Sequence, residues 1–412
     1  MTSTACAVLI VGSGPAGLFA ADHLCRAGVT NVVIVEKGKQ MSFRVCPDNA
    51  FCECALCDVL EGEGGAGSFS DGKITLSATR GTHAQRLFTA EQAALLAEVE
   101  RTIRGFVPEG VFYAPVPCLT ALEGHDEAGL RFESYPLLHV GSDGVRRFGQ
   151  RYSAHLQGQG VTVMTGVEAR ELVITEGRAT GAVLYDHHAR VESSIRCGFV
   201  VVAAGLIGTF WLEDQLRVAG VKLGGGPADI GIRLETSAAA LEPFIDEFYD
   251  FKVEHTSRAG VTLRSFCVNG NGFVVNEFHR PLGIRGVNGH SFLDWKSGLS
   301  NLAILATIDE AFTPDPKAHV REVAARVNNG AGGYPVCQTL MEFLPGGTGP
   351  SLGITPSNPK TRPGRLEQLL PAVLHEAFTS YIRALGRVLP PVLAPDTVIY
   401  APEINTTTIG YP

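Results

Sequence analysis

Two short, wholly apolar runs near the start of the chain flank a stretch with helical spacing. Residues 8–11 (VLIV) and 32–35 (VVIV) carry no polar side chain, which is typical of strands buried on both faces of a parallel sheet. Between them, residues 18–27 place apolar side chains on one face and stop before Gly28, as a helix C-terminus does. The pattern predicts a strand–turn–helix–strand unit.

The turn between the first strand and the helix is rich in glycine and reads GSGPAG at residues 12–17. Gly12 permits the tight turn, Gly14 lets a pyrophosphate approach the backbone, and Gly17 lets the helix pack on the strand. Free N–H groups and the dipole at the helix start attract phosphates. A glycine-rich turn without a ligand is the alternative, but the order of elements favours a Rossmann-like dinucleotide site.

The second strand ends on an acidic residue, Glu36. A carboxylate there accepts the hydroxyl protons of an adenosine ribose and disfavours a 2′-phosphate, so we expect FAD or NAD rather than NADP. Gly224, Gly225 and Gly226 neither follow a buried strand nor open a helix, so we expect one dinucleotide site and not two.

Further helices and strands follow this opening unit. Helical spacing covers residues 90–104 and 145–157. Short apolar runs predict strands at residues 161–164, 172–174, 182–184 and 194–197. Residues 199–205 form another buried run ending in glycine, which we expect to complete the first parallel sheet.

Apolar and polar residues alternate after residue 236, as at 261–267, which predicts a largely antiparallel sheet with one face covered. Residues 366–387 read as a helix that Pro390 breaks. The predicted fold class is α/β: a parallel sheet with helices on both faces, plus an inserted α+β domain. We expect a discontinuous dinucleotide-binding domain at residues 1–105 and 145–235, interrupted by an excursion at 106–144. A substrate or cap domain follows at 236–345, and a C-terminal helical segment at 346–412 returns to the first domain.

Composition narrows the class of protein. The chain has 412 residues, of which 45% are hydrophobic and 48 are glycine, which suits an α/β protein of two or three domains. A net charge of -8 without a basic tract argues against nucleic acid and anionic membrane as partners. The start of the sequence does not resemble a signal peptide, and the ten cysteines favour reduced thiols in a cytosol. We therefore expect a cytoplasmic protein that acts on a small molecule.

Four cysteines lie close together with the spacing C-x5-C-x-C-x2-C, namely Cys46, Cys52, Cys54 and Cys57. Four thiolates so near one another could bind zinc or an iron–sulfur cluster. The spacing differs from that of paired CxxC knuckles, so reduced structural thiols and a disulfide remain as alternatives.

Several segments, in order along the chain, resemble those of a known family. They are GSGPAGLFAA at 12–21, VEK at 35–37, GGAGSFSDGK at 64–73, LHVGSD at 138–143, VVVAAG at 200–205, ADIGIRLE at 228–235, FCVNGNGFVVN at 266–276, VNGHS at 287–291 and YAPEI at 400–404. They resemble the glutathione-reductase-type FAD proteins and, more closely, a group of bacterial FAD-dependent dehydrogenases. The resemblance implies an FAD-dependent oxidoreductase that transfers a hydride between a small organic substrate and flavin N5, in specialised metabolism. The alternative is a flavin-binding protein without a redox role, such as an isomerase, a cyclase or an accessory subunit.

The resemblance also implies roles for individual residues around FAD. Those expected at the pyrophosphate are Gly12, Gly14, Pro15, Ala16 and Gly17; at the ribose, Glu36 and Lys37; near the flavin, Gly64, Gly65, Ala66, Gly67, Ser68 and Ser70; at the adenine, Val167; and beside the dinucleotide, Ala204 and Gly205. Relatives continue past YAPEI into a segment that closes over the pyrophosphate, whereas this chain stops at Pro412. Either the chain is truncated or part of the FAD site is built differently.

Hydride transfer to a flavin needs a group that moves the companion proton. His290 is the first candidate because histidine titrates near neutral pH, and a structural hydrogen bond is its alternative role. Arg233 could anchor a substrate carboxylate or stabilise reduced flavin, or form only a surface ion pair. Lys73 could lie near flavin N1 or N5, and His139 is a weaker candidate. Electrons would pass to or from a transient partner such as NAD(P)H or O2.

Overall fold

The computed structural model describes residues 4–46, 54–77, 92–115, 129–347 and 355–406. Cys52, residues 90–91 of the first expected amphipathic helix, and the chain end at 409–412 lie outside them. The described residues form two compact units. Unit 1 takes its described residues from Met1–Phe69 and Asp143–Gly224, and unit 2 from Ser70–Ser142 and Gly225–Thr408.

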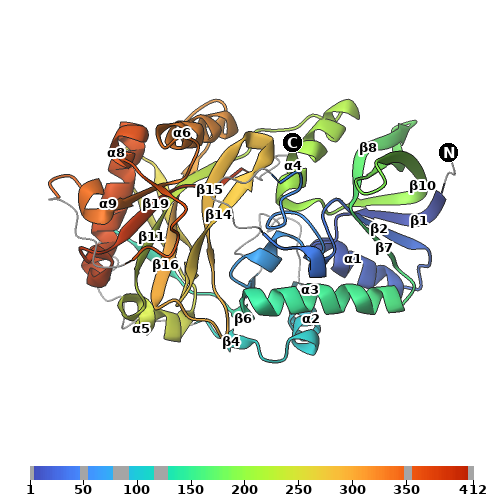
Figure 1. Cartoon of the computed structure of the whole chain (residues 1–412), viewed down its shortest axis with the longest axis horizontal. Helices are drawn as coiled ribbons and strands as arrows, with labels where there is room; N and C mark the ends of the chain where they lie inside the picture. Colours follow the sequence, from blue (N-terminus) through green and yellow to red (C-terminus); the bar gives the residue numbers. More distant parts are fainter. Residues whose placement is uncertain (1–3, 47–53, 78–91, 116–128, 348–354, 407–412) are drawn as a thin grey trace. The chain divides into compact units, whose positions relative to one another are not determined.

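Unit 1 is built on a six-stranded sheet with the order β7-β2-β1-β10-β9-β8 (Figure 1). Its strands are β1 (Thr4–Val11), β2 (Val32–Glu36), β7 (Thr162–Thr165), β8 (Val167–Thr175), β9 (Arg178–Asp186) and β10 (Val191–Val202). The first four in sheet order run parallel, and β10, β9 and β8 form an antiparallel meander. Every residue of β2 is buried, as its apolar run predicts.

The longest strand of unit 1 contains residues that we expected to form two separate strands. Residues 194–197 and 199–202 both belong to β10, whose first half pairs with β9 and whose second half pairs with β1. Only Gly198 separates the two runs, and the strand changes partner before it, at Ile195 and Arg196, which pair with both β9 and β1.

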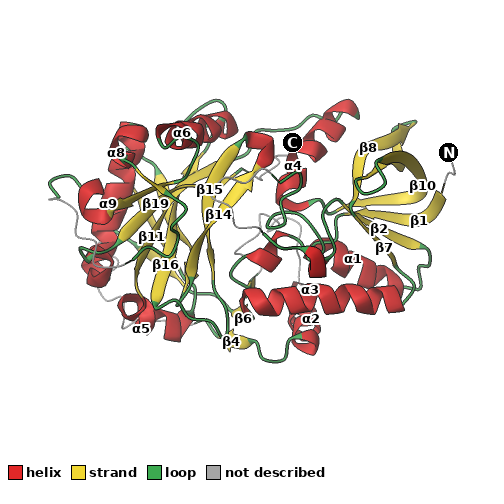
Figure 2. Cartoon of the chain, viewed as in Figure 1, coloured by secondary structure: helices red, strands yellow, loops and turns green. Residues whose placement is uncertain are grey.

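The helices of unit 1 flank this sheet and include most of one long helix that begins in unit 2 (Figure 2). They are α1 (Pro15–Arg26), α3 (Gly141–Gly158) and α4 (Gly205–Val218), with the 3-10 turns η1 (Met41–Phe43) and η2 (Ala66–Phe69). Helix α1 starts three residues before the expected stretch because Pro15, with its fixed φ, suits the first helical position. It buries Leu18 and Ala21.

Unit 2 is built on an eight-stranded sheet with the order β18-β17-β19-β11-β16-β13-β12-β5. These strands are β5 (Arg131–Glu133), β11 (Ala228–Ser237), β12 (Lys252–Thr256), β13 (Thr262–Asn269), β16 (Leu299–Ile308), β17 (Val336–Thr339), β18 (Arg362–Pro363) and β19 (Val398–Asn405). All neighbours are antiparallel except β17 and β18. This confirms the prediction of a largely antiparallel sheet.

Smaller sheets and helices complete unit 2. The strands are β3 (Lys73–Thr75), β4 (Val111–Tyr113) and β6 (Leu137–His139) in one sheet, and β14 (Phe273–His279) and β15 (Ile284–His290) in a hairpin. The helices are α2 (Gln92–Phe106), α5 (Ala238–Phe248), α6 (Pro316–Gly330), α7 (Leu340–Phe343), α8 (Leu366–Leu369) and α9 (Ala372–Val388), with η5 (Arg280–Leu282) and η6 (Pro390–Leu393). The apolar faces of α5, α6 and α9 form one core with the large sheet.

Two expectations about unit 2 need correction. The helix expected at 366–387 is two helices, because Pro371 cannot continue α8 and instead caps α9. The expected domain boundaries also differ from the observed units. Described residues of 70–105 belong to unit 2, where β3 pairs with β6, and so do those of 346–408, where β19 lies between β11 and β17. Within the described residues, no helix is both long and apolar enough to cross a membrane.

Candidate functional site

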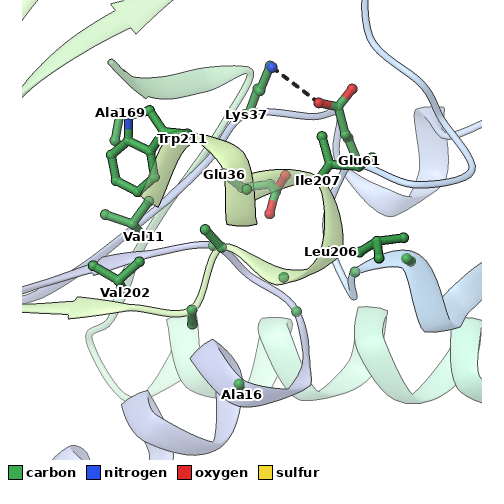
Figure 3. A pocket seen from close by; sticks show the side chains of 18 of the residues that line it. Val11, Ala16, Glu36, Lys37, Glu61, Ala169, Val202, Leu206, Ile207 and Trp211 are labelled. Atoms are coloured by element: carbon green, nitrogen blue, oxygen red, sulfur yellow. Dashed lines mark ion pairs between the residues drawn. The ribbon is translucent and has the colours of Figure 1, made fainter. Parts of the chain in front are cut away.

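A pocket of about 360 Å³ opens in unit 1 beside the carboxyl ends of β1, β2 and β10 (Figure 3). Open α/β sheets bind ligands at this edge, beyond the ends of the parallel strands. Of the expected cofactor-binding residues, eleven line it: Gly12, Gly14, Pro15, Ala16, Glu36, Lys37, Gly65, Ala66, Val167, Ala204 and Gly205. Gly17, Gly64, Gly67, Ser68 and Ser70 do not line the pocket.

Two glycines of the turn leave no room for a Cβ, whereas a Cβ on Gly14 would have only the Gly65 Cα, at 3.6 Å, within 4 Å. A Cβ on Gly12, whose φ is +105°, would lie 2.3 Å from the Ala203 carbonyl oxygen, and one on Gly17 would lie 2.0 Å from the Gly12 oxygen. The N-cap of α1 is Gly14, which offers no side-chain acceptor, and the first turn carries no acidic residue. The exposed N-terminus of α1 can therefore accept an anion at the pocket.

Glu36 is the acidic residue at the end of β2, and protein donors already surround its carboxylate. One oxygen accepts hydrogen bonds from the Ser13 N–H and hydroxyl, both at 2.9 Å. The other accepts from the N–H groups of Gly38 at 2.9 Å and Gly62 at 3.0 Å. Glu36 thus ties β2 to the glycine turn and to the loop that follows residue 58, while also lining the pocket. Its contact with a ribose stays a prediction.

Next to Glu36, a lysine bridges two carboxylates at the pocket, and Figure 3 shows its ion pair with Glu61. Lys37 Nζ lies 3.2 Å from Glu61 and 3.2 Å from Glu168. Burial works to lower the lysine pKa, but the two carboxylates outweigh it and raise the pKa. Because Lys37 is already neutralised, this end of the pocket presents no free cation to a nucleotide phosphate.

The other side of the pocket is apolar, and sequence reasoning missed most of it. Figure 3 shows Val11, Val202, Ala169 and Trp211 grouped there. The Trp211 indole N–H donates to the Arg170 carbonyl at 2.7 Å, which fixes the ring. The signal available in the sequence was the apolar stretch directly after the strand that ends at 205, which folds as α4 and also lines the pocket.

Only part of the glycine-rich loop at 64–73 lines the pocket, namely Gly65 and Ala66. Gly65 packs against the turn, since a Cβ on it would lie 3.0 Å from the Gly14 Cα. Gly67 is exposed. The buried Ser68 hydroxyl has no hydrogen-bond partner among the described residues, and Ser70 belongs to unit 2. A turn too tight for a Cβ at Gly12 and Gly17 and an uncapped helix start together fit a pyrophosphate-bearing cofactor.

The expected catalytic residues all lie in unit 2. The Lys73 side chain is only 5% exposed. Its Nζ lies 2.8 Å from Asp71 and 3.2 Å from Asp250, and it also donates to the Val268 carbonyl at 2.8 Å. Burial would lower the pKa of Lys73, but Asp250 and Asp71 more than offset this and raise it. Lys73 is therefore a fixed cation in a structural network.

Arg233 is fully buried and paired. Its Nε and Nη2 donate to the Glu403 carboxylate at 2.8 and 2.6 Å, and its Nη1 donates to Asn301 at 2.8 Å. The expected alternative was an ion pair at the surface, whereas the observed pair lies in the core. A guanidinium so occupied has no free edge for a substrate carboxylate.

The two candidate histidines both lie within hydrogen-bonding distance of serine hydroxyls. His290 Nδ1 lies 3.4 Å from the Ser142 hydroxyl. His139 stacks on Tyr249 at 3.8 Å, and its Nε2 lies 3.1 Å from the Asp71 carbonyl and 3.2 Å from the Ser291 hydroxyl. Burial lowers the pKa of His139 to about 4, so this imidazole is neutral near pH 7.

The cysteine cluster does not form a metal site in the part of the chain that is described. No group of three or more His, Cys, Asp or Glu side chains among the described residues is arranged to hold a metal ion. Cys46, Cys54 and Cys57 are in that part, and Cys52 is not. The expected zinc or iron–sulfur cluster therefore has no support there.

Comparisons with known proteins agree with this pocket. A family model described as FAD binding domain matches residues 7–251, and one described as FAD-dependent protein, C-terminal domain-like, matches residues 244–406. Among curated proteins, no sequence matches the chain.

Several solved structures resemble the chain at low identity. The L-amino acid deaminase from Proteus vulgaris is 16% identical over 57% of this chain and 55% of its own, with a TM-score of 0.34. The glycerol-3-phosphate dehydrogenase from Bacillus halodurans, complexed with FAD, is 12% identical over 79% and 53%, with a TM-score of 0.39. The flavoprotein/dehydrogenase from Cytophaga hutchinsonii is 14% identical over 79% and 61%, with a TM-score of 0.36.

The chain thus spans little more than half the length of the first two of these proteins. TM-scores this low carry no argument about activity. The FAD binding domain model, in contrast, covers more than half of the chain and the whole pocket. The chain therefore belongs to the FAD binding domain family, and its cofactor is FAD.

Proposed function

We propose that the protein is an FAD-dependent oxidoreductase that transfers a hydride between a small organic substrate and flavin N5. The observation that carries the proposal is the convergence, in one pocket of unit 1, of the Gly12–Gly17 turn, the uncapped start of α1 and the carboxylate of Glu36. The more specific parts of the proposal rest on sequence motifs: kinship with bacterial dehydrogenases of the glutathione-reductase type, and a role in specialised metabolism.

FAD, when bound, supplies a two-electron acceptor for the substrate. We assign the pyrophosphate to the start of α1 at Gly14 and Ala16, and the adenosine to the apolar wall beside Val167 and Trp211. The Glu61–Lys37–Glu168 bridge supports FAD over a nucleotide with a further phosphate, because two carboxylates would repel that group.

His290 is our candidate for moving the companion proton. Its Nδ1 contact with the Ser142 hydroxyl supports this role, because such a contact fixes the orientation of the ring. Arg233 and Lys73 were candidates for substrate or flavin contact, and their carboxylate partners favour positioning roles instead. A transient electron partner such as NAD(P)H or O2 and a cytoplasmic location complete the proposal. The single dinucleotide motif supports the first, and the ten cysteines of the sequence, which favour reduced thiols in a cytosol, support the second.

Anaerobic mixing of FAD-loaded protein with a panel of amines, hydroxy acids and reduced nicotinamides tests the proposal. We expect at least one compound to bleach the flavin band near about 450 nm, and oxygen or an artificial acceptor to restore it. Conversion of a compound with no change in its oxidation state and no electrons reaching an acceptor would contradict the proposal. That result would support the isomerase or cyclase alternative.

A further inference from the structure

Arg44 is a buried cation of unit 1 that neither the glycine motif nor the family resemblance singled out. Only 4% of it is exposed, and it follows η1 directly. Its guanidinium donates to five main-chain carbonyl oxygens, all within eight consecutive residues. They belong to Asp58 at 3.1 Å, Val59 at 3.1 Å, Gly62 at 3.4 Å, Glu63 at 2.6 Å and Gly65 at 2.9 Å.

Because the loop carbonyls point towards Arg44, the N–H groups of the same peptides point away from it. The C=O and the next N–H of a planar trans peptide point in opposite directions. The Glu63 carbonyl accepts from Arg44, and the Gly64 N–H of the same peptide donates to the Ser13 carbonyl at 3.0 Å. The Gly65 carbonyl likewise faces Arg44, which turns the Ala66 N–H to the opposite side, and Ala66 lines the pocket.

The same loop has two further contacts, one with Glu36 at the end of β2 and one with the dinucleotide turn. The Gly62 N–H donates to Glu36 at 3.0 Å, and a Cβ on Gly65 would lie 3.0 Å from the Gly14 Cα. The contacts of the loop with the turn and with Glu36 therefore depend on a backbone path whose carbonyls accept hydrogen bonds from Arg44. Nη1 of Arg44 makes three of these carbonyl contacts with its two N–H groups, and Nε and Nη2 make one each.

We propose that Arg44 is a positioning residue for FAD binding: it holds residues 58–65 against the Gly12–Gly17 turn so that the pocket exists before the cofactor arrives. This goes beyond the proposed redox function, because it concerns affinity for FAD and would hold for a non-redox flavoprotein too. Pre-forming the loop spares the ordering entropy that FAD would otherwise have to offset on binding.

A neighbouring arginine offers a matched control. Arg44 and Arg146 lie over the same Phe69 ring, at 4.8 and 4.0 Å from its centroid. Arg146 donates a hydrogen bond to this region, from Nε to the Ser68 carbonyl at 2.9 Å. Arg146→Lys thus removes a guanidinium from the same ring without removing the five-carbonyl contact of Arg44.

The test compares the FAD dissociation constants of full-length apoprotein carrying Arg44→Lys or Arg146→Lys with that of the unmodified protein. A lysine ammonium has three donors and cannot reach five carbonyls. We expect Arg44→Lys to weaken FAD binding at least about tenfold, or about 1.4 kcal/mol. We expect the FAD dissociation constant of Arg146→Lys to stay within about threefold of the unmodified value, because only one neutral acceptor loses one hydrogen bond.

Hydrogen exchange of the apoproteins separates positioning from general destabilisation. The proposal predicts faster exchange at residues 58–66 in Arg44→Lys, with the amides of β1 and β2 unchanged. Exchange that accelerates equally in β1 and β2, or an FAD dissociation constant within threefold of the unmodified value, would overturn it. If Arg44→Lys does not fold, Arg44→Gln, which keeps two donors and no charge, is judged by the same two criteria.

Discussion

At the scale of single residues, the chain buries charged side chains that its sequence would suggest lie at the surface. Arg233 and Glu403 form a two-point ion pair in the core of unit 2, and a Cβ on Gly289 would lie 2.6 Å from the Arg233 guanidinium. The residue next to Gly289 is His290. The buried pair therefore supports the strand that carries the candidate proton-transfer group, which makes Arg233 a positioning residue.

Replacing Arg233 should unfold the protein more readily. Arg233→Met leaves the Glu403 carboxylate buried without its partner, so we expect the free energy of unfolding to fall by about 3–5 kcal/mol in urea titrations. Arg264→Met is the matched control, because Arg264 pairs with Asp229 at 2.6 Å but keeps 25% of its side chain exposed. We expect that change to cost about 1 kcal/mol. Equal losses in the two variants would contradict the assignment.

His139 makes stability depend on pH. Burial lowers its pKa from the ordinary 6.5 to about 4 in the folded protein, so the unfolded chain binds a proton more readily between these values. The contribution of His139 to stability is therefore complete above about pH 6.5 and is lost as the pH falls towards 4. Its neighbours include Asp71, Lys73, Tyr249 and Ser291.

The comparison that checks this is the unfolding free energy of unmodified protein and His139→Gln at pH 7.5 and pH 5. We expect the unmodified protein to lose about 2 kcal/mol more than the variant over this interval. Parallel losses in both proteins would show that His139 does not titrate as described.

At the scale of elements, the glycine turn between β1 and α1 is the feature on which the pocket depends. Gly12 and Gly28 both adopt positive φ, +105° and +80°, but only Gly12 has a neighbour within 4 Å of its would-be Cβ. A side chain at either position would therefore strain the backbone, but only a side chain at Gly12 would also clash with a neighbour.

We expect Gly12→Ala to weaken FAD binding at least about tenfold, which corresponds to about 1.4 kcal/mol. The Ala203 carbonyl, 2.3 Å from the added Cβ, has to move, and Ala203 lines the pocket. Gly28→Ala should lose about 1–2 kcal/mol of stability from strain alone. Its FAD affinity, measured by quenching of flavin fluorescence, should not change, and a similar loss of affinity in both variants would argue against a clash at the turn.

At the scale of the whole molecule, the sequence predicts those parts of the fold that short-range periodicity specifies. The β1–α1–β2 unit, the parallel strands of unit 1 and the antiparallel sheet of unit 2 all follow from local patterns. The pairing of Arg233 with Glu403, 170 residues apart, does not. Neither do the contacts of Arg44 or the place of Trp211 in the pocket, because no local pattern specifies which distant segments meet.

The central claim is that unit 1 binds FAD in the pocket between the glycine turn and α4. Titration of full-length apoprotein with FAD, followed by isothermal calorimetry and by absorbance near about 450 nm, tests it most directly. The account predicts one FAD bound per chain, with binding weakened by Gly12→Ala and by Arg44→Lys. Protein that is folded yet shows no flavin absorbance and takes up no FAD would contradict it.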